Sequence, residues 1–252
     1  MLDLLKLRLR HGYQAIPEIR KAALMETHRG FPVIEESKYQ GNWQEVIDVC
    51  PTGAITKDPL RIDLGKCIFC GECENCSSGA IRFTNDHKVG CSDREHLIVP
   101  SGTRFDEYRE RAIETRKEIH RLFGRSLKLR QVSAGGCNGC ETELIACGNV
   151  NFDMGRFGID FVASPRHADG IVLTGPITKN MAPALRDAYK SIADPKIVIA
   201  VGACAISGGV FADSTELNRS FLGEIRIDLF VPGCPPHPLT FINAVLDFIG
   251  RA

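Results

Sequence analysis

The sequence predicts an α/β protein: a mostly parallel sheet covered by helices on both faces, preceded by a small α+β unit. Three observations lead to this fold class. In the second half of the chain, short runs rich in β-branched residues alternate with helical patterns, which is typical of a parallel sheet. The first half is rich in turn-forming residues and has short apolar pieces. Eleven cysteines fall into groups, and 252 residues suffice for one large domain or two small ones.

The composition excludes several classes of protein. A hydrophobic fraction of 44% with 25% charged residues is that of a folded globular chain. A net charge of zero argues against nucleic acid as the main partner. No apolar run approaches the roughly 20 residues of a membrane-spanning helix. Because the N-terminus lacks a small-residue cleavage site and the cysteines are odd in number, we expect a cytoplasmic protein without a disulfide framework.

The first hundred residues predict an arm and a small unit. Residues 1–30 alternate leucine with lysine and arginine, which indicates an amphipathic arm or short helix that contacts a membrane surface or a neighbouring subunit or domain. The unit that follows has short apolar pieces at Glu45–Val49, Ala54–Thr56 and Ala80–Phe83. Because no element there is long enough to build a sizeable core, we expect a metal cluster to stabilise the fold of this unit.

The second half predicts a connector and then alternating strands and helices. Ser101 can cap a helix that ends at Gly124. The predicted strands are Leu127–Val132, Asp160–Ala163, Gly170–Thr174, Lys196–Val201 and Arg226–Val231. The predicted helices are Met181–Ile192 and Pro238–Ile249.

The first cysteine group predicts an iron–sulfur cluster. Residues 67–73 read CIFCGEC, the C-x2-C-x2-C run of bacterial ferredoxins, in which the fourth cysteine of each motif serves the other cluster. Cys50, followed by a proline, is in the right place to be that fourth ligand. Zinc is the alternative for the same thiolates, although zinc sites favour two separated C-x2-C pairs. The predicted ligands of one [4Fe–4S] cluster are Cys50, Cys67, Cys70 and Cys73.

A second cluster in this unit is predicted to be lost, because residues 31–49 contain no cysteine. Cys76 would have served that cluster and is interpreted as a vestige. A competing set of four consecutive cysteines, with Cys76 in place of Cys50, requires one short loop to reach all four corners of a cluster. Cys91 and Cys147 are expected to be packed or free thiols.

The second cysteine group predicts a cluster at the edge of the sheet. Its members follow three predicted strands, and the carboxyl ends of parallel strands are where such sheets gather ligands. Glycines in GGCNGC and at 208–209 allow the close backbone approach that a bulky cluster needs. The predicted ligands of a second [4Fe–4S] cluster are Cys137, Cys140, Cys204 and Cys234.

These motifs resemble a known family. Residues 127–250 resemble the small-subunit module shared by [NiFe] hydrogenases and the cluster-bearing 20 kDa subunit of respiratory complex I. The resemblance rests on GGCNGCE at 135–141, SPRHADGIVLTGPIT at 164–178, GACAISGG at 202–209 and PGCPPHP at 232–238. The C-x2-C spacing is similar to the energy-converting and formate-hydrogenlyase-type hydrogenases, whereas the complex I subunit has adjacent cysteines. Residues 1–90 resemble the ferredoxin-like subunit of the same complexes in DLGKCIFCGEC at 63–73.

The resemblance implies a flavodoxin-like sheet domain preceded by a ferredoxin-like domain. The implied divisions are an arm (1–30), a ferredoxin-like domain with one cluster (31–100), a helical connector (101–126) and the hydrogenase small-subunit/complex-I-like domain (127–252). It further implies an oxidoreductase subunit without catalytic residues of its own, which relays electrons through two [4Fe–4S] clusters. The nickel–iron centre would lie on a partner large subunit, and a ferredoxin or a formate dehydrogenase-type protein would be the electron partner. Further membrane-complex subunits would attach it peripherally to the inner face of the cell membrane.

Several alternatives stay open at this point. A complex-I-like quinone or ferredoxin oxidoreductase would keep the fold without hydrogenase chemistry, and a zinc-stabilised scaffold would have no redox activity. Glu141 and Glu143 could move protons, face the large subunit, or serve as solvated or helix-capping residues. Arg166 and His167 match a family segment, and they either touch the cluster or fix a turn.

Overall fold

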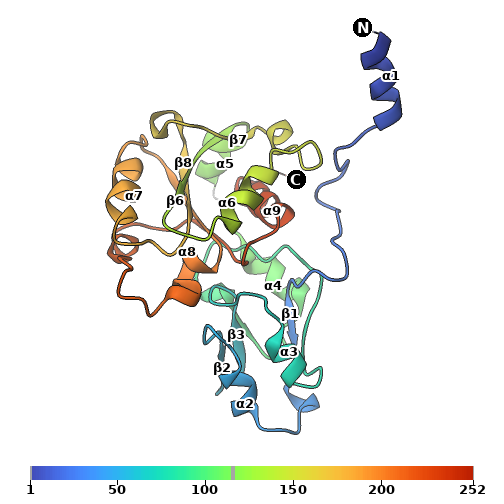
Figure 1. Ribbon diagram of the computed structural model, residues 1–252, viewed down its shortest axis with the longest axis vertical. Coiled ribbons are helices and arrows are strands. Elements are labelled where there is room, and N and C mark those ends of the chain that lie inside the picture. The colour runs from blue at the N-terminus through green and yellow to red at the C-terminus, as the bar shows by residue number, and fades with distance from the viewer. Residues whose placement is uncertain (1, 115–116, 252) are drawn as a thin grey trace.

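Five parallel strands form the main sheet, in the order β10-β9-β8-β6-β7 (Figure 1). The structure is a computed structural model and describes residues 2–114 and 117–251. The strands are β6 (Leu127–Ser133), β7 (Ile159–Phe161), β8 (Gly170–Thr174), β9 (Ile197–Val201) and β10 (Leu229–Val231). In sequence order within the domain this is 2-1-3-4-5, the flavodoxin-like order. The predicted fold class is confirmed for this part of the chain.

Both faces of the sheet are buried, because successive side chains of a strand point to opposite faces. On β8, Ile171 and Leu173 belong to one hydrophobic cluster, while Val172 belongs to the other. Helix α7 (Met181–Lys190) packs into the first cluster. Helices α9 (Pro238–Phe248) and α6 (Gly139–Ala146) pack into the second. The apolar strand runs of the sequence therefore reflect burial on two sides.

The N-terminal part is α+β in composition and lies below the main sheet in Figure 1. β1 (Pro32–Ile34) pairs antiparallel with β4 (Ile81–Phe83), and β3 (Arg61–Asp63) pairs antiparallel with both β2 (Ile55–Thr56) and β5 (Ile98–Pro100). Its helices are α2 (Trp43–Asp48) and α3 (Glu72–Cys76). These short elements do not need a core of their own, because Phe31, Leu64 and Leu97 join the cluster under the main sheet that contains Ile171.

The connector differs from the single predicted helix. The described residues form α4 (Phe105–Ala112) and α5 (Lys117–Phe123), and residues 115–116 lie outside the described residues. Ser101 does not cap α4, because its hydroxyl donates to the carbonyl of Ile34 at 3.2 Å. Arg104 is the N-cap instead, and its backbone N–H donates to the carboxylate of Glu107 at 3.5 Å.

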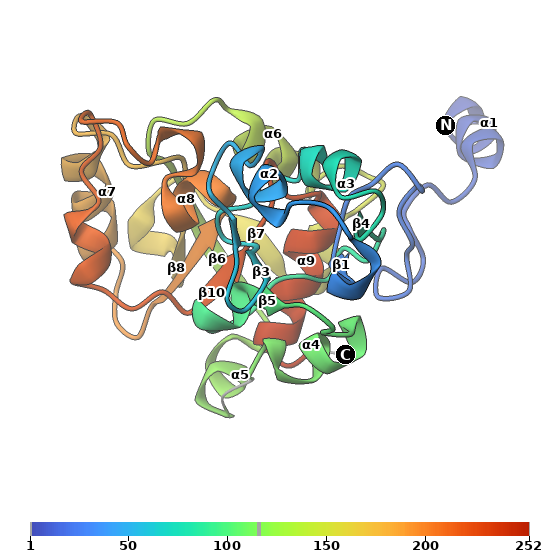
Figure 2. The ribbon, with the colours of Figure 1, turned by 90° about the horizontal axis from the view of Figure 1, so that it is seen from below.

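Helix α1 (Leu2–His11) stands away from the rest of the molecule (Figures 1 and 2). All of its side chains are exposed, including five leucines. The chain reaches the body at Tyr13, whose hydroxyl accepts a hydrogen bond from Arg156 at 3.2 Å, and further on Arg20 forms a salt bridge at 2.5 Å with Asp247 of α9. Within the described part of the chain, no helix is long and apolar enough to cross a membrane.

The tight contact between β8 and β9 can be tested at Gly170. A Cβ at this position would lie 2.3 Å from Cγ1 and 2.6 Å from the carbonyl oxygen of Ile197. Because the second contact is with strand backbone, we expect Gly170→Ala to lower the free energy of unfolding by about 1–3 kcal/mol in urea denaturation. The matched control is Gly223→Ala, whose Cβ would meet no described atom within 4 Å. Equal losses in the two variants would contradict this account of the packing.

Candidate metal centres

Three loops at the carboxyl edge of the sheet bring the second cysteine group together. Cys137 and Cys140 follow β6, and the other two follow β9 and β10. The four sulfur atoms interact electrostatically: burial, followed by the charges of its neighbours, raises the pKa of Cys140 to about 12. Those neighbours are Glu141, Cys204, Cys234 and Cys137. Cys137 and Cys234 are exposed at the rim, while Cys140 and Cys204 are half-buried.

Glycines provide the space behind these sulfur atoms. A Cβ on Gly202 would lie 2.5 Å from Sγ of Cys140, and Gly202 has a φ of +87° that favours glycine. A Cβ on Gly209 would lie 2.9 Å from Sγ of Cys204. The cysteine loops can therefore close around a bulky group because side chains are missing where the backbone turns.

Glu141 is a buried carboxylate at this site, with an exposed fraction of 7%. Its Oε1 accepts a hydrogen bond from the hydroxyl of Thr174 at 2.6 Å. Burial alone would raise the pKa of Glu141, but hydrogen bonds from the side chains of Ser133 and Thr174 lower it below its usual value. Glu141 is therefore not the solvated residue that the sequence allowed. Glu143 is half-buried, and burial raises its pKa.

The first cysteine group also lies in one place. Cys50, Cys67, Cys70 and Cys73 line a single cavity together with apolar side chains such as Ile55. The other lining residues are Thr52, Ala54, Ile62, Ile68, Gly71 and Phe83. Cys76 does not line this cavity and is exposed.

Backbone N–H groups point at two of these sulfur atoms. The N–H of Ala54 donates to Sγ of Cys50 at 3.2 Å, and the N–H of Phe69 donates to Sγ of Cys67 at 3.3 Å. Burial, followed by the charges of Cys50 and Cys70, raises the pKa of Cys73 to about 12. Hydrogen bonds of this kind to sulfur are among the features that set the reduction potential of an iron–sulfur cluster.

The donor sets at both sites fit a thiolate-bound metal group. Four neighbouring thiols lose their protons together only when a cation offsets their charge, because each thiolate raises the pKa of the others. Four sulfur ligands suit a [4Fe–4S] cluster or a zinc ion. Among residues 2–114 and 117–251, no three His, Cys, Asp or Glu side chains stand close enough to hold a single metal ion, so the fit is one of donor chemistry and not of coordination geometry.

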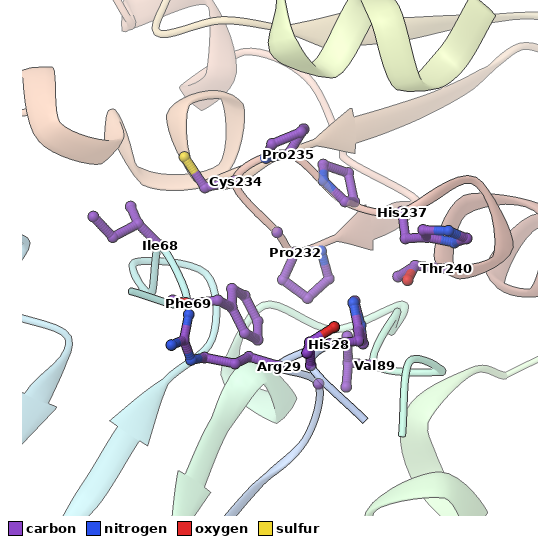
Figure 3. Close-up of a pocket in the computed structure, with 14 residues that line it drawn as sticks. His28, Arg29, Ile68, Phe69, Val89, Pro232, Cys234, Pro235, His237 and Thr240 are labelled. Atoms are coloured by element: carbon purple, nitrogen blue, oxygen red, sulfur yellow. Dashed lines mark hydrogen bonds between the residues drawn. The ribbon is translucent and has the colours of Figure 1, made fainter. Parts of the chain in front are cut away.

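A cavity separates the two sites (Figure 3). Ile68 and Phe69, from the loop that carries Cys67 and Cys70, lie across it from Cys234 and Pro235. Phe69 adopts a φ of +55°, which turns the loop at its tip. The sequence did not point to this arrangement, because the spacing within each motif carries no information on which residues of the two motifs face each other.

Three histidines near this cavity were also missed. His28 and His237 line it with their ring centroids 5.9 Å apart. His87 is 5% exposed, and its Nε2 has no hydrogen-bond partner among the described residues. Burial, followed by the charges of Lys88, His237 and His28, lowers the pKa of His87 to about 4. His237 lies within PGCPPHP and had a signal in the sequence, whereas His28 and His87 had none.

The remaining predicted residues can also be placed. Cys91 is buried and donates to the carbonyl of Asp93 at 2.9 Å, and Cys147 is buried in the cluster around α9. Arg166 and His167 lie in the 3-10 turn Pro165–His167 with exposed side chains. The expectation of packed or free thiols at Cys91 and Cys147 is confirmed for the described structure.

A flavodoxin-like sheet with cysteines at its carboxyl edge defines a class of protein, the electron-transfer subunits of hydrogenase and complex I-like oxidoreductases. Within that class, the chain belongs to the family described as NADH ubiquinone oxidoreductase, 20 Kd subunit, whose profile matches residues 137–248. This match covers most of the sheet domain, from the loop after β6 to the last helix, and does not bear on the N-terminal part.

Three relatives illustrate the range of this family. The probable membrane-bound hydrogenase subunit mbhJ of Pyrococcus furiosus is 42% identical over 51% of this chain and 77% of its own length. Formate hydrogenlyase subunit 7 of Escherichia coli is 48% identical over 45% of each chain. An NADH-quinone oxidoreductase subunit of Geotalea daltonii is 43% identical over 44% of this chain and 67% of its own length.

The buried state of His87 predicts an acid-sensitive fold. Its pKa is lower in the folded chain, at about 4, than the ordinary value of 6.5. Between these values the unfolded chain binds more protons, so stability is present above pH 6.5 and is lost as the pH falls toward 4. We expect the free energy of unfolding, measured in urea at pH 7 and pH 5, to fall less steeply in His87→Gln than in the parent. An unchanged pH dependence in this variant would contradict the assignment.

Proposed function

We propose that this chain is the electron-transfer small subunit of a [NiFe] hydrogenase complex and that it holds two [4Fe–4S] clusters. The first would be bound by Cys50, Cys67, Cys70 and Cys73. The second would be bound by Cys137, Cys140, Cys204 and Cys234. A cluster of this kind supplies one-electron oxidation and reduction when it is bound. Zinc-stabilised scaffolding is the competing use of the same thiols.

The main support for electron transfer between the two sites is that the two cysteine loops face each other across one cavity. Ile68 and Phe69 extend from the first site toward the loop of Cys234 (Figure 3). Since no domain or long helix intervenes in the described structure, electrons could pass between the two sites within one chain. The protein's part is to hold the loops apart at a constant distance and to surround the first site with apolar side chains.

The exposed rim of the second site supports a partner subunit. Cys137 and Cys234 are exposed. Ile145 on α6, the helix that contains Cys140, is 68% exposed, and Val210 and Phe211, beyond Cys204, are 54% and 43% exposed. Exposed apolar side chains around a functional edge are typical of a protein–protein interface. The partner would be a large subunit that holds the nickel–iron centre, as the C-x2-C spacing of the hydrogenase branch implies.

The N-terminal part belongs to the same proposal. A ferredoxin-like domain at 31–100, with an arm at 1–30 and a connector at 101–126, would exchange electrons with a ferredoxin or a formate dehydrogenase-type partner. The exposed leucines of α1 provide a surface for further subunits of a membrane complex. The chain would then work in the cytoplasm, attached peripherally to the inner face of the cell membrane.

A complex-I-like quinone or ferredoxin oxidoreductase is the second candidate. It is favoured by the similarity to the NADH-quinone oxidoreductase relative, whose identity to this chain is close to that of the hydrogenase relatives. The C-x2-C spacing favours the hydrogenase. The large subunit that co-purifies with the chain would decide between them.

The ligand assignment can be tested by iron content. After anaerobic reconstitution we expect about eight irons per chain, from two sites of four. Cys50→Ala should remove about four irons, because Cys50 lines the same cavity as Cys67, Cys70 and Cys73. Cys76→Ala is the matched control and should leave the iron content unchanged, because Cys76 is exposed outside that cavity.

The opposite pattern would overturn this assignment. Loss of about four irons in Cys76→Ala, with none lost in Cys50→Ala, would show that four consecutive cysteines hold the cluster. A colourless protein that binds zinc and lacks the broad visible absorbance of iron–sulfur groups would overturn the redox function altogether.

The partner surface can be tested at Phe211. Phe211→Glu places a charge on the exposed rim and should reduce the yield of co-purified large subunit roughly tenfold or more. The matched control is Leu122→Glu on α5, which is 47% exposed and precedes the amino end of β6, opposite the carboxyl edge that carries the cysteines. Normal co-purification of Phe211→Glu, or hydrogen uptake by the isolated chain, would contradict the proposed arrangement.

A further inference from the structure

Arg219 lies at the second cysteine site without being part of either cysteine motif. It precedes the 3-10 turn Ser220–Gly223, in a stretch of exposed and half-buried polar residues. Its guanidinium is nevertheless turned inward, toward the short helix α8 (Ala203–Ser207) that carries Cys204. No motif in the sequence indicated a function for this residue.

The guanidinium makes four hydrogen bonds to backbone carbonyls. Nη1 donates to Cys204 at 2.9 Å and to Pro176 at 3.1 Å. Nη2 donates to Ala205 at 2.8 Å and to Ile206 at 3.0 Å. Three of these acceptors are carbonyls in the last turn of α8, where helical N–H partners run out. The carbonyl of Cys204 also accepts a hydrogen bond from the N–H of Gly208 at 2.9 Å, which closes the helix. The planar fork of arginine matches all of these acceptors, whereas the ammonium of lysine has three donors and can serve only some of them.

These bonds connect two of the cysteine loops. Pro176 belongs to the turn after β8, and this turn packs on the loop that leads to Cys137. The N–H of Ile177 donates to the carbonyl of Ala134 at 3.0 Å. The backbones of Gly175 and Gly136 touch so closely that a Cβ on Gly175 would lie 2.7 Å from the amide nitrogen of Gly136. Arg219 therefore ties the helix of Cys204 to the support of the Cys137 loop.

The segment that carries Arg219 is itself fixed to the same turn. The N–H of Asn218 donates to the carbonyl of Ile177 at 2.9 Å, and the N–H of Lys179 donates to the carbonyl of Glu216 at 2.8 Å. These two bonds fix the backbone just before Arg219 to the turn after β8, from which the side chain reaches α8.

The charge of Arg219 is directed at the cysteine site. Among the described residues, no carboxylate forms a salt bridge with Arg219, so carbonyl dipoles are its hydrogen-bond partners. Because Nη1 donates to the carbonyl of Cys204 itself, the positive charge lies beside the residue whose thiol belongs to the site. A half-buried cation is screened less by water and salt than an exposed one.

We propose that Arg219 is a positioning residue of the second cysteine site, where it holds the Cys204 helix in place and makes reduction of the bound group more favourable. This inference rests on the proposed function, because it requires a redox group at Cys137, Cys140, Cys204 and Cys234. Reduction adds one electron and one negative charge to the site, and no bond forms or breaks. A fixed positive charge stabilises the more negative state by Coulomb attraction.

The test uses the complex purified anaerobically with its native partners. Arg219→Gln removes the positive charge. Arg219→Lys keeps the positive charge but changes the arrangement of the hydrogen-bond donors. Midpoint potentials of both clusters are measured by EPR-monitored redox titration. For Arg219→Gln we expect the equilibrium constant for reduction at the second site to fall roughly tenfold, which is about 59 mV for one electron. Arg219→Lys should recover most of this shift.

Two controls separate this role from a structural one. The first site serves as an internal reference, and its potential should not move in either variant. The second control is Arg186→Gln, which removes an arginine of the same domain that pairs with Glu224 on the exposed surface. Its potentials should equal those of the parent. A merely structural role would lower cluster content in both Arg219 variants without restoring the potential in the lysine variant.

The outcomes decide the inference. It is overturned if Arg219→Gln has the parental potential, or if the lysine and glutamine variants shift it equally. If the glutamine variant cannot hold iron at the second site, the lysine variant decides: a retained cluster with near-parental potential supports the inference, and a lost cluster overturns it. A parent complex without any signal from a second cluster would instead refute the proposed function, before any variant is measured.

Discussion

The relative position of the two cysteine sites depends on one packing interaction, the hydrophobic cluster that the N-terminal part shares with a face of the parallel sheet. Ile62 and Leu64 lie just before Cys67 in sequence, and they are buried in the same cluster as Leu173 of β8. Because a close-packed interior resists small displacements, this contact holds the first site at a constant distance from the second. Within the N-terminal part, a salt bridge at 2.6 Å between Arg94 and Asp63 fixes β3 to the segment before β5.

The second site depends on the connectivity of the sheet. Strand order reverses at β6, because β7 lies on one side of it and β8 on the other. Ligands gather at such a reversal because the loops diverge there and leave space between them. Cys137 follows β6 at this point, and the turn after β8 supports its loop from behind. The carbonyl of Pro176 in the same turn accepts a hydrogen bond from Arg219. This turn therefore both supports the Cys137 loop and helps to position the positive charge.

The sequence predicted those features that arise from local patterns. β8 at Gly170–Thr174 matches its predicted range, since a β-branched run between turn residues defines a buried strand. The connector was less predictable: Ser101 had the chemistry of a cap, but its hydroxyl bonds to Ile34, a residue 67 positions away. Cysteine spacing placed Cys50 with Cys67, although it could not show Phe69 facing Cys234. Arg219 was not identified because its role comes from long-range contacts with carbonyls, which leave no periodic signal.

The junction between the two parts has a consequence for the outer strand of the sheet. β10 is an edge strand, and its Phe230 exchanges two backbone hydrogen bonds with Cys91, at 2.8 and 3.0 Å. Exposed strand edges tend to recruit strands from other molecules. Here the N-terminal part covers that edge with its own backbone, and the chain thereby protects itself against self-association. A sheet domain that began at residue 127 would leave the edge of β10 uncovered. The N-terminal part therefore also limits aggregation through this edge.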